Sequence, residues 1–134
     1  WKKYCAKHGM HSTSEDFFSK NFYWPNEAPI FNDEMLTLIN KQYAVDTVIT
    51  HTAPVFCELI TKNGLQSFVA SDESLLKDVE EERSTMTELY DRLVYDAHPL
   101  EHWYYGHFHQ SWHSSIKGVL FKMLDIMEFT PINY

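Results

Sequence analysis

Trp103-Tyr104-Tyr105-Gly106-His107-Phe108-His109 is the stretch of sequence that most constrains the fold. An aromatic run typical of a buried strand reaches a glycine, where the chain can turn sharply, and two histidines follow it one residue apart. In an extended backbone such residues point to the same face, so we expect His107 and His109 to direct two imidazoles at one small volume. Neutral imidazole is the commonest metal ligand near pH 7, although two such histidines can equally be packing or surface residues.

A second stretch, residues 45–54, carries another histidine at the end of a predicted strand. Its β-branched run favours a strand over residues 45–50, and Pro54, which has no N–H to donate, closes it. His51 stands where the strand ends, and loops at strand ends are where α/β folds place their chemistry. A satisfied polar residue at a strand edge is the alternative for His51 taken alone.

The two stretches together resemble motifs of the calcineurin-like metallophosphoesterase superfamily, in particular its bacterial Ser/Thr-phosphatase-like members. The matching motifs are Thr50-His51-Thr52-Ala53-Pro54 and Gly106-His107-Phe108-His109, and Tyr23-Trp24-Pro25-Asn26-Glu27 is similar to the segment that precedes the first of them in bacterial members. The similarity runs in order from about Phe22 to Phe129. It implies metal-dependent hydrolysis of a phosphate ester, with His51 and His107 as ligands of one metal and His109 as a ligand of the other.

The motifs that open this family are missing from the sequence. Family members begin with Asp-x-His, Gly-Asp-x-x-Asp and Gly-Asn-His, which supply carboxylates, an asparagine and the catalytic histidine. Here the four glycines are followed by Met10, Leu65, His107 and Val119. We interpret the one Asp-x-His, at residues 96–98, as a coincidence, because it lies at the end of a predicted helix just before Pro99. The resemblance therefore implies that residues 1–134 are the C-terminal portion of a single phosphoesterase domain, and the start at Trp1 fits a fragment or a processed product.

The implied cofactors are two divalent metal ions, from among manganese, iron, zinc, nickel and cobalt. The missing N-terminal half or a second chain would supply the carboxylate bridge, so we expect the isolated chain to be inactive. Three imidazoles could still hold one such ion weakly. The alternative is a non-catalytic binding or assembly module that pairs with another chain. Cys57 could be a softer ligand, and His102 or His113 could support the ligands, but we interpret Cys57 as a buried free thiol and the two histidines as packing or exposed residues.

Hydrophobic periodicity predicts an α/β (α+β) fold. The resemblance implies that it is the C-terminal half of a four-layer α/β/β/α sandwich with a mixed sheet. Asn32 as N-cap, with acidic residues after it, predicts a helix over about 33–43. Ser71 or Asp72 caps the longest helix, over about 72–96. We expect its apolar face to carry Leu75, Leu76, Val79, Met86, Leu89, Tyr90, Leu93 and Val94, and its solvent face to carry Glu80, Glu81, Arg83, Glu88 and Asp91.

The remaining segments give weaker signals. Residues 1–21 are expected to be a loosely ordered lead-in, residues 65–71 a loop and residues 130–134 a tail. A helical turn follows Pro54, Asn63-Gly64 marks a turn, and a strand covers 102–106. The pattern over residues 116–126 predicts two short strands or one bent strand, with Gly118 as a weak spot or a bulge.

Composition restricts the partners. The net charge of −8 argues against nucleic acid or an anionic membrane surface as the main partner, and the acidic residues gather on a predicted helix face. No apolar run approaches the length needed to span a bilayer. Cys5 and Cys57 lack any metal or redox spacing and are expected to be free thiols, which favours a cytoplasmic location. The sequence has neither a glycine-rich phosphate loop nor a Gly-x-Ser-x-Gly elbow.

Overall fold

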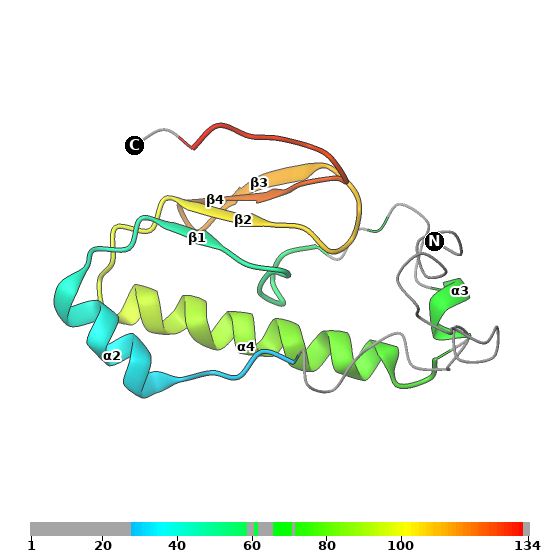
Figure 1. Ribbon diagram of the computed structural model, residues 1–134, viewed down its shortest axis with the longest axis horizontal. Helices are drawn as coiled ribbons and strands as arrows, with labels where there is room; N and C mark the ends of the chain where they lie inside the picture. Colours follow the sequence, from blue (N-terminus) through cyan, green and yellow to red (C-terminus); the bar gives the residue numbers. More distant parts are fainter. Residues whose placement is uncertain (1–27, 59–60, 62–65, 71, 133–134) are drawn as a thin grey trace, which may run out of the picture.

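The computed structural model describes residues 28–58, 61, 66–70 and 72–132 (Figure 1). The elements follow the order α2 (Asp33–Gln42), β1 (Thr47–Ile49), α3 (Gln66–Val69), α4 (Leu75–Tyr95), β2 (His102–Tyr105), β3 (Trp112–Ile116) and β4 (Val119–Met123). A four-stranded mixed sheet lies above α4 and α2, and the segment after β4 passes over its other side (Figure 1). The predicted α/β class is confirmed. No helix in these ranges is long and apolar enough to cross a membrane.

The sheet has the strand order β1-β2-β4-β3, with β1 at one edge of the part described. β1 pairs with β2 and β2 with β4 in parallel, whereas β3 and β4 are antiparallel. In the β1–β2 ladder, Thr47 lies opposite His102 and Ile49 opposite Tyr104. Because β1 and β2 run in the same direction, the segments that follow them emerge at the same edge of the sheet.

The β3–β4 hairpin corrects the prediction for residues 116–126. The first strand begins earlier, at Trp112, and Gly118 lies in a two-residue turn, where it is not a bulge. Lys117 and Gly118 have φ values of 52° and 85°. Two successive left-handed residues are what a type I′ hairpin turn requires, and glycine adopts this conformation without steric cost.

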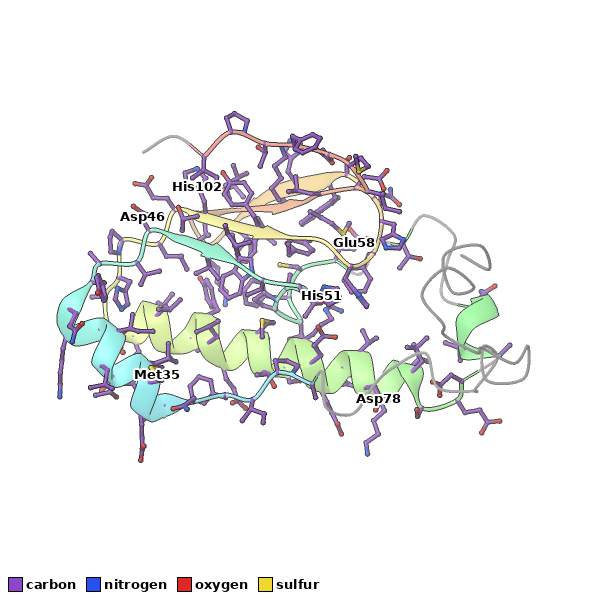
Figure 2. All side chains as sticks on the ribbon, in the orientation of Figure 1. Met35, Asp46, His51, Glu58, Asp78 and His102 are labelled. Atoms are coloured by element: carbon purple, nitrogen blue, oxygen red, sulfur yellow. The ribbon has the colours of Figure 1, made fainter. Side chains whose placement is uncertain are left out.

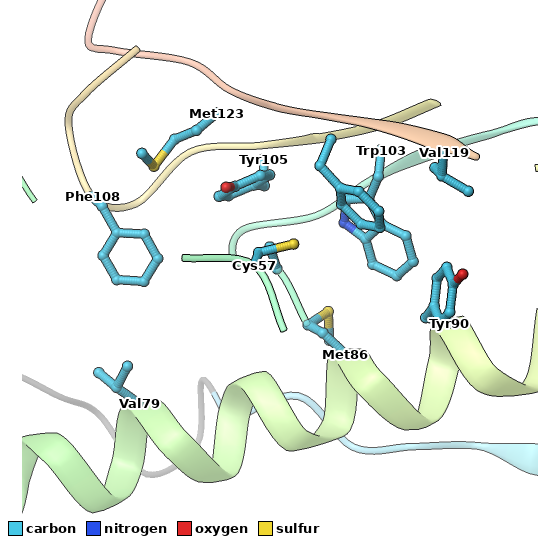
Figure 3. Close-up of a cluster of buried hydrophobic side chains, with 11 residues drawn as sticks. Cys57, Val79, Met86, Tyr90, Trp103, Tyr105, Phe108, Val119 and Met123 are labelled. Carbon is cyan, nitrogen blue, oxygen red and sulfur yellow. The ribbon is translucent and has the colours of Figure 1, made fainter. Parts of the chain in front are cut away.

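The core lies between α4 and the sheet (Figure 3). Side chains at helical spacing on α4 meet the inward-facing, alternate residues of β2 and β4, and the largest of these are fully buried. Most of the predicted apolar stripe of α4 is therefore confirmed, but Leu76 and Val94 are exposed. The buried residues of this contact are Val79, Met86, Tyr90, Trp103, Tyr105, Val119, Phe121 and Met123, and Leu93 of α4 is buried as well.

Helix α4 begins at Leu75, three residues later than predicted, because Asp72 forms a turn ahead of it. The Asp72 carboxylate accepts hydrogen bonds from the backbone N–H of Ser74 at 3.0 Å and from the Ser74 hydroxyl at 2.8 Å. Ser74 occupies the N-cap position, where its side chain makes no capping bond. A local side-chain turn has thus displaced the start of the helix.

Helix α2 is confirmed, with Asn32 as its N-cap: the Asn32 side chain accepts the N–H of Met35 at 2.9 Å. Arg92 of α4 holds α2 through Asp33 and through the Thr37 hydroxyl at 3.1 Å.

The Asp-x-His at residues 96–98 belongs to this same contact. Asp96 pairs with Arg92 at 2.6 Å and accepts from Asn40, and His98 accepts the N–H of Val45 at 2.9 Å. Val45 precedes β1, so Asp96 and His98 lie at the opposite end of the sheet from His51. This agrees with our interpretation of the motif as a coincidence.

Three other predictions concern the irregular parts of the chain. Residues 65–71 were expected to be a loop, but residues 66–69 form one helical turn, α3. The C-terminal residues that are described, 124–132, contain no helix or strand, in line with the predicted tail. The lead-in over 1–21, the segment over 23–27, Cys5, Asn63-Gly64 and Ser71 lie outside the described residues.

We expect Phe121→Ala to lower the free energy of unfolding by about 3–5 kcal/mol. Phe121 is fully buried and its ring packs on Trp103, Phe56 and Tyr90 at centroid distances of 5.7, 5.5 and 6.1 Å. Urea unfolding measures the loss. Phe129→Ala is the matched control, because Phe129 is 84% exposed and should change stability by less than about 0.5 kcal/mol. Equal effects of the two substitutions would contradict this account of the core.

Candidate functional site

The two histidine-bearing stretches meet because the β1–β2 ladder continues past both strands. The N–H of Thr50 donates to the carbonyl of Tyr104 at 3.0 Å, and the N–H of Gly106 donates to the carbonyl of His51 at 3.2 Å. His51 and Gly106 are therefore hydrogen-bonded neighbours at the carboxyl edge of two adjacent parallel strands. Figure 2 shows His51 at the end of the sheet opposite Asp46. This is the edge at which open α/β sheets bind their ligands.

The rings of His51 and His107 are in contact. Their centroids lie 4.3 Å apart with an interplanar angle of 61°. The expected approach of these two side chains is confirmed, and each ring comes from the end of a different strand. His51 is exposed, whereas His107 is partly buried and also meets the ring of Phe108 at 4.7 Å.

His107 and His109 do not lie in an extended backbone, so the expectation that they share a face for that reason is wrong. β2 ends at Tyr105, and the N–H of Phe108 donates to the carbonyl of Gly106 at 2.9 Å. With a φ of 69° at His107, this is a γ-turn of the rare form, and His109 also has a positive φ of 53°. Phe108 is buried in the core, and the chain turns sharply around it.

The γ-turn places backbone strain at a histidine. A residue other than glycine held in such a conformation costs on the order of 1–3 kcal/mol, and the surrounding structure must maintain it. Strain of this kind gathers at functional sites, so its occurrence at His107 supports a functional role for this turn.

Burial, together with repulsion from the neighbouring His51 and His109, lowers the pKa of His107 to about 4, because a second positive charge there would be unfavourable. His107 is therefore neutral at pH 7. A neutral imidazole keeps a lone pair available, which is the form that binds a metal ion or accepts a proton.

His109 is the one of the three histidines that does not take part in the ring contact. It is exposed and lies with His107 beside a pocket of about 330 Å³ that also takes in Ile49, Tyr104 and Asp125. His51 opens to a different pocket, of about 480 Å³. Among the described residues, no group of three or more His, Cys, Asp or Glu side chains is arranged to hold a metal ion. The structure thus brings His51 and His107 together and places His109 nearby without forming a complete ligand set.

Arg83 was predicted to face solvent, and this prediction is wrong. Its side chain is only 9% exposed, and the guanidinium donates hydrogen bonds to the backbone carbonyls of the loop that follows His51. A sequence signal for this was present, because Arg83 falls between Val79 and Met86 at the spacing of the buried stripe. A charged residue at such a position indicates a buried polar contact.

Glu82 was not considered as a site residue, yet it lines the pocket of His51 together with Thr50, Thr52, Met86 and Pro29. It is 5% exposed and has no hydrogen-bond or ionic partner among the described residues. Burial raises its pKa. The Thr52 hydroxyl beside it is also buried without a hydrogen-bond partner in the part described. The edge of the site near His51 thus carries one buried hydroxyl without a described partner and one carboxylate that lines the pocket.

The three secondary candidates behave as packing or surface residues. Cys57 is a buried free thiol whose pKa is raised to about 12, above all by burial, so it is not a thiolate ligand at neutral pH. His102 stacks on Tyr104, with the ring planes 2° apart. His113 is exposed on β3.

No family model, curated protein or solved structure matches this chain.

We expect Glu82→Gln to stabilise the protein near neutral pH and to leave its stability unchanged well below pH 4.5. The pKa of Glu82 is raised from 4.5 in the folded state, so the unfolded chain loses this proton at a lower pH than the folded protein does. Stability must then fall as the pH rises through 4.5, and the amide variant avoids that loss.

Urea unfolding at several pH values measures the effect. Glu80→Gln, on the exposed face of the same helix, is the control and should leave the free energy of unfolding unchanged at every pH. A Glu82→Gln variant that is less stable than the wild type near pH 7 would show that the carboxylate has a partner.

Proposed function

We propose that this chain is the histidine-bearing portion of a metal-dependent phosphoesterase, a phosphatase of the calcineurin-like type, with His51, His107 and His109 as metal ligands. The observation that carries the proposal is the 4.3 Å contact between the His51 and His107 rings at the carboxyl ends of adjacent parallel strands. A cytoplasmic location is part of the proposal, and the free thiol of Cys57 fits it.

The residues present fit a metal by their chemistry. His51 and His107 would hold one divalent ion and His109 a second, all through neutral nitrogen. Divalent cations held there would supply Lewis-acid binding of phosphate oxygens and would lower the pKa of a bound water. His107 contributes a ring that stays neutral at pH 7, on a backbone that the γ-turn holds in place.

The proposal requires groups that the described residues do not supply. A two-metal site needs bridging carboxylates, and in the described ranges no carboxylate joins the histidines in a metal-binding group. We assign the carboxylates, and the asparagine and histidine that contact phosphate in this family, to an N-terminal portion of the same domain or to a second chain. The same portion would contribute the second sheet and the outer helix layer of a four-layer sandwich, of which this chain forms one sheet and one helix layer.

A second candidate is an assembly module without catalytic activity. It is favoured by the edge position of β1, where Ile49 is 67% exposed, and by the exposed apolar side chains of Ile126, Met127 and Phe129. An unpaired strand edge beside exposed apolar residues readily takes a further chain. The two candidates differ in one outcome: an assembly module forms a complex without turnover.

Wild-type chain should bind Zn²⁺ or Ni²⁺ weakly, and His107→Ala should weaken binding by at least about tenfold, because it removes the ring that meets His51. Isothermal calorimetry measures both affinities. His113→Ala, which removes an exposed histidine from β3, is the control and should bind as the wild type does. Equal affinities for wild type and His107→Ala would show that His107 is not a ligand.

Hydrolysis of an aryl phosphate with Mn²⁺ should be negligible for this chain alone and should appear when a separately expressed segment with the Asp-x-His, Gly-Asp-x-x-Asp and Gly-Asn-His motifs is added. The carboxylate bridge comes from that segment, and His109→Ala should abolish the activity that it restores. The release of phenolate is the measurement. Robust turnover by the chain alone, lost in His109→Ala, would contradict the proposed division of the site.

A further inference from the structure

The loop after β1, residues 50–57, is held from below by two side chains of α4. The Arg83 Nε donates to the carbonyl of Ala53 at 3.4 Å, and Nη2 donates to those of Pro54 and Val55, each at 3.2 Å, and to that of Cys57. Thr87 accepts the N–H of Val55 at 3.0 Å and donates its own proton to the carbonyl of Arg83 at 3.0 Å. Four carbonyls of one loop thus converge on one cation.

The chemistry of this contact is specific to arginine. Guanidinium offers five N–H donors in a rigid planar fork, whereas a lysine ammonium offers three on a single atom. Arg83 has no ion-pair partner among the described residues, so loop carbonyls alone compensate its buried charge. The loop in turn needs these donors, because buried carbonyls without a partner are costly. The shape of the loop and the position of Arg83 therefore depend on each other.

His51 sits where two sets of restraints on this loop meet. On the sheet side, its carbonyl accepts the N–H of Gly106, and the preceding Thr50 hydroxyl accepts the indole N–H of Trp103 at 2.7 Å and donates to the carbonyl of Thr52 at 2.5 Å. On the helix side, Arg83 holds the chain from Ala53 onward. The His51 ring itself makes no hydrogen bond to any described residue; the loop backbone sets where its Cβ lies, and the ring rests against that of His107.

We infer that Arg83 is a positioning residue for the site: its hydrogen bonds to the loop carbonyls hold the His51 ring against His107. The metal-binding part of this inference rests on the proposed function, whereas the ring contact does not. The role is distinct from general stabilisation, because it concerns one loop at one edge of the sheet. Arg92 offers the matched comparison: it is an arginine of the same helix, but it fastens α2 and does not contact the His51 loop.

The test compares Arg83→Met and Arg83→Lys with Arg92→Met in the full 134-residue chain. One readout is the NMR cross-relaxation between ring protons of His51 and His107, and the other is the affinity for Zn²⁺ alone. Arg83→Met should lose the ring cross-peak and bind Zn²⁺ at least about tenfold more weakly. Arg83→Lys should give intermediate values, since an ammonium satisfies only some of the carbonyls. Arg92→Met should keep the cross-peak and an affinity within about twofold of wild type, although it is less stable.

A wild-type cross-peak in folded Arg83→Met would overturn the inference, and so would equal losses in Arg83→Met and Arg92→Met. If Arg83→Met does not fold, Arg83→Lys decides by the same two readouts. A third outcome separates the two proposals. If the wild-type chain binds no Zn²⁺ and the ring cross-peak is lost only in the Arg83 variants, the proposed metal site is refuted and the role of Arg83 is supported.

Discussion

The parallel pairing of β1 with β2 is the constraint on which the rest of this site depends. A shift of one residue between the strands would turn alternate side chains to the other face and separate His51 from Gly106. The indole N–H of Trp103 fixes the pairing, because this ring is fully buried and its N–H reaches the hydroxyl of Thr50. A buried tryptophan needs such a partner, so the hydrogen bond that satisfies the core also sets the register that brings the histidines together.

Beyond the strands, the same core imposes the strained turn. Phe108 enters the apolar layer between α4 and the sheet, and the chain must reverse within one residue on either side to allow it. His107 is consequently held in a γ-turn, with its ring partly buried and neutral, while His109 projects outward. The free energy gained by burying the Phe108 ring thereby offsets the backbone strain at His107. The two histidines of this motif differ in environment because the residue between them belongs to the core.

The elements that could be predicted from the sequence are those with local signals. The Asn32 cap and the acidic first turn predicted α2, and apolar residues at helical spacing predicted α4. The β-branched and aromatic runs predicted β1 and β2. The turn at His107 could not be predicted, since it depends on the burial of Phe108 against residues elsewhere in the chain. Arg83 was misassigned for a related reason: its carbonyl partners lie about thirty positions earlier, and a charge on a helix is usually solvated. For the site, the contact between His51 and His107 could be predicted because each histidine follows a strand. The position of His109, apart from this pair, could not be predicted from the sequence.

Two consecutive charged residues of α4, Glu82 and Arg83, are buried beneath the loop that carries His51, and they differ in how their charges are compensated. The carbonyls of the loop surround Arg83, whereas Glu82 has no partner in the described part of the chain. The Thr52 and Tyr105 hydroxyls are buried there without a hydrogen-bond partner among the described residues, and each belongs to one of the two segments that meet at this edge. Native interiors leave few such groups unsatisfied. Groups outside the described residues, in this chain or in another, can satisfy these hydroxyls, and the proposed two-part phosphoesterase is one arrangement that would supply them.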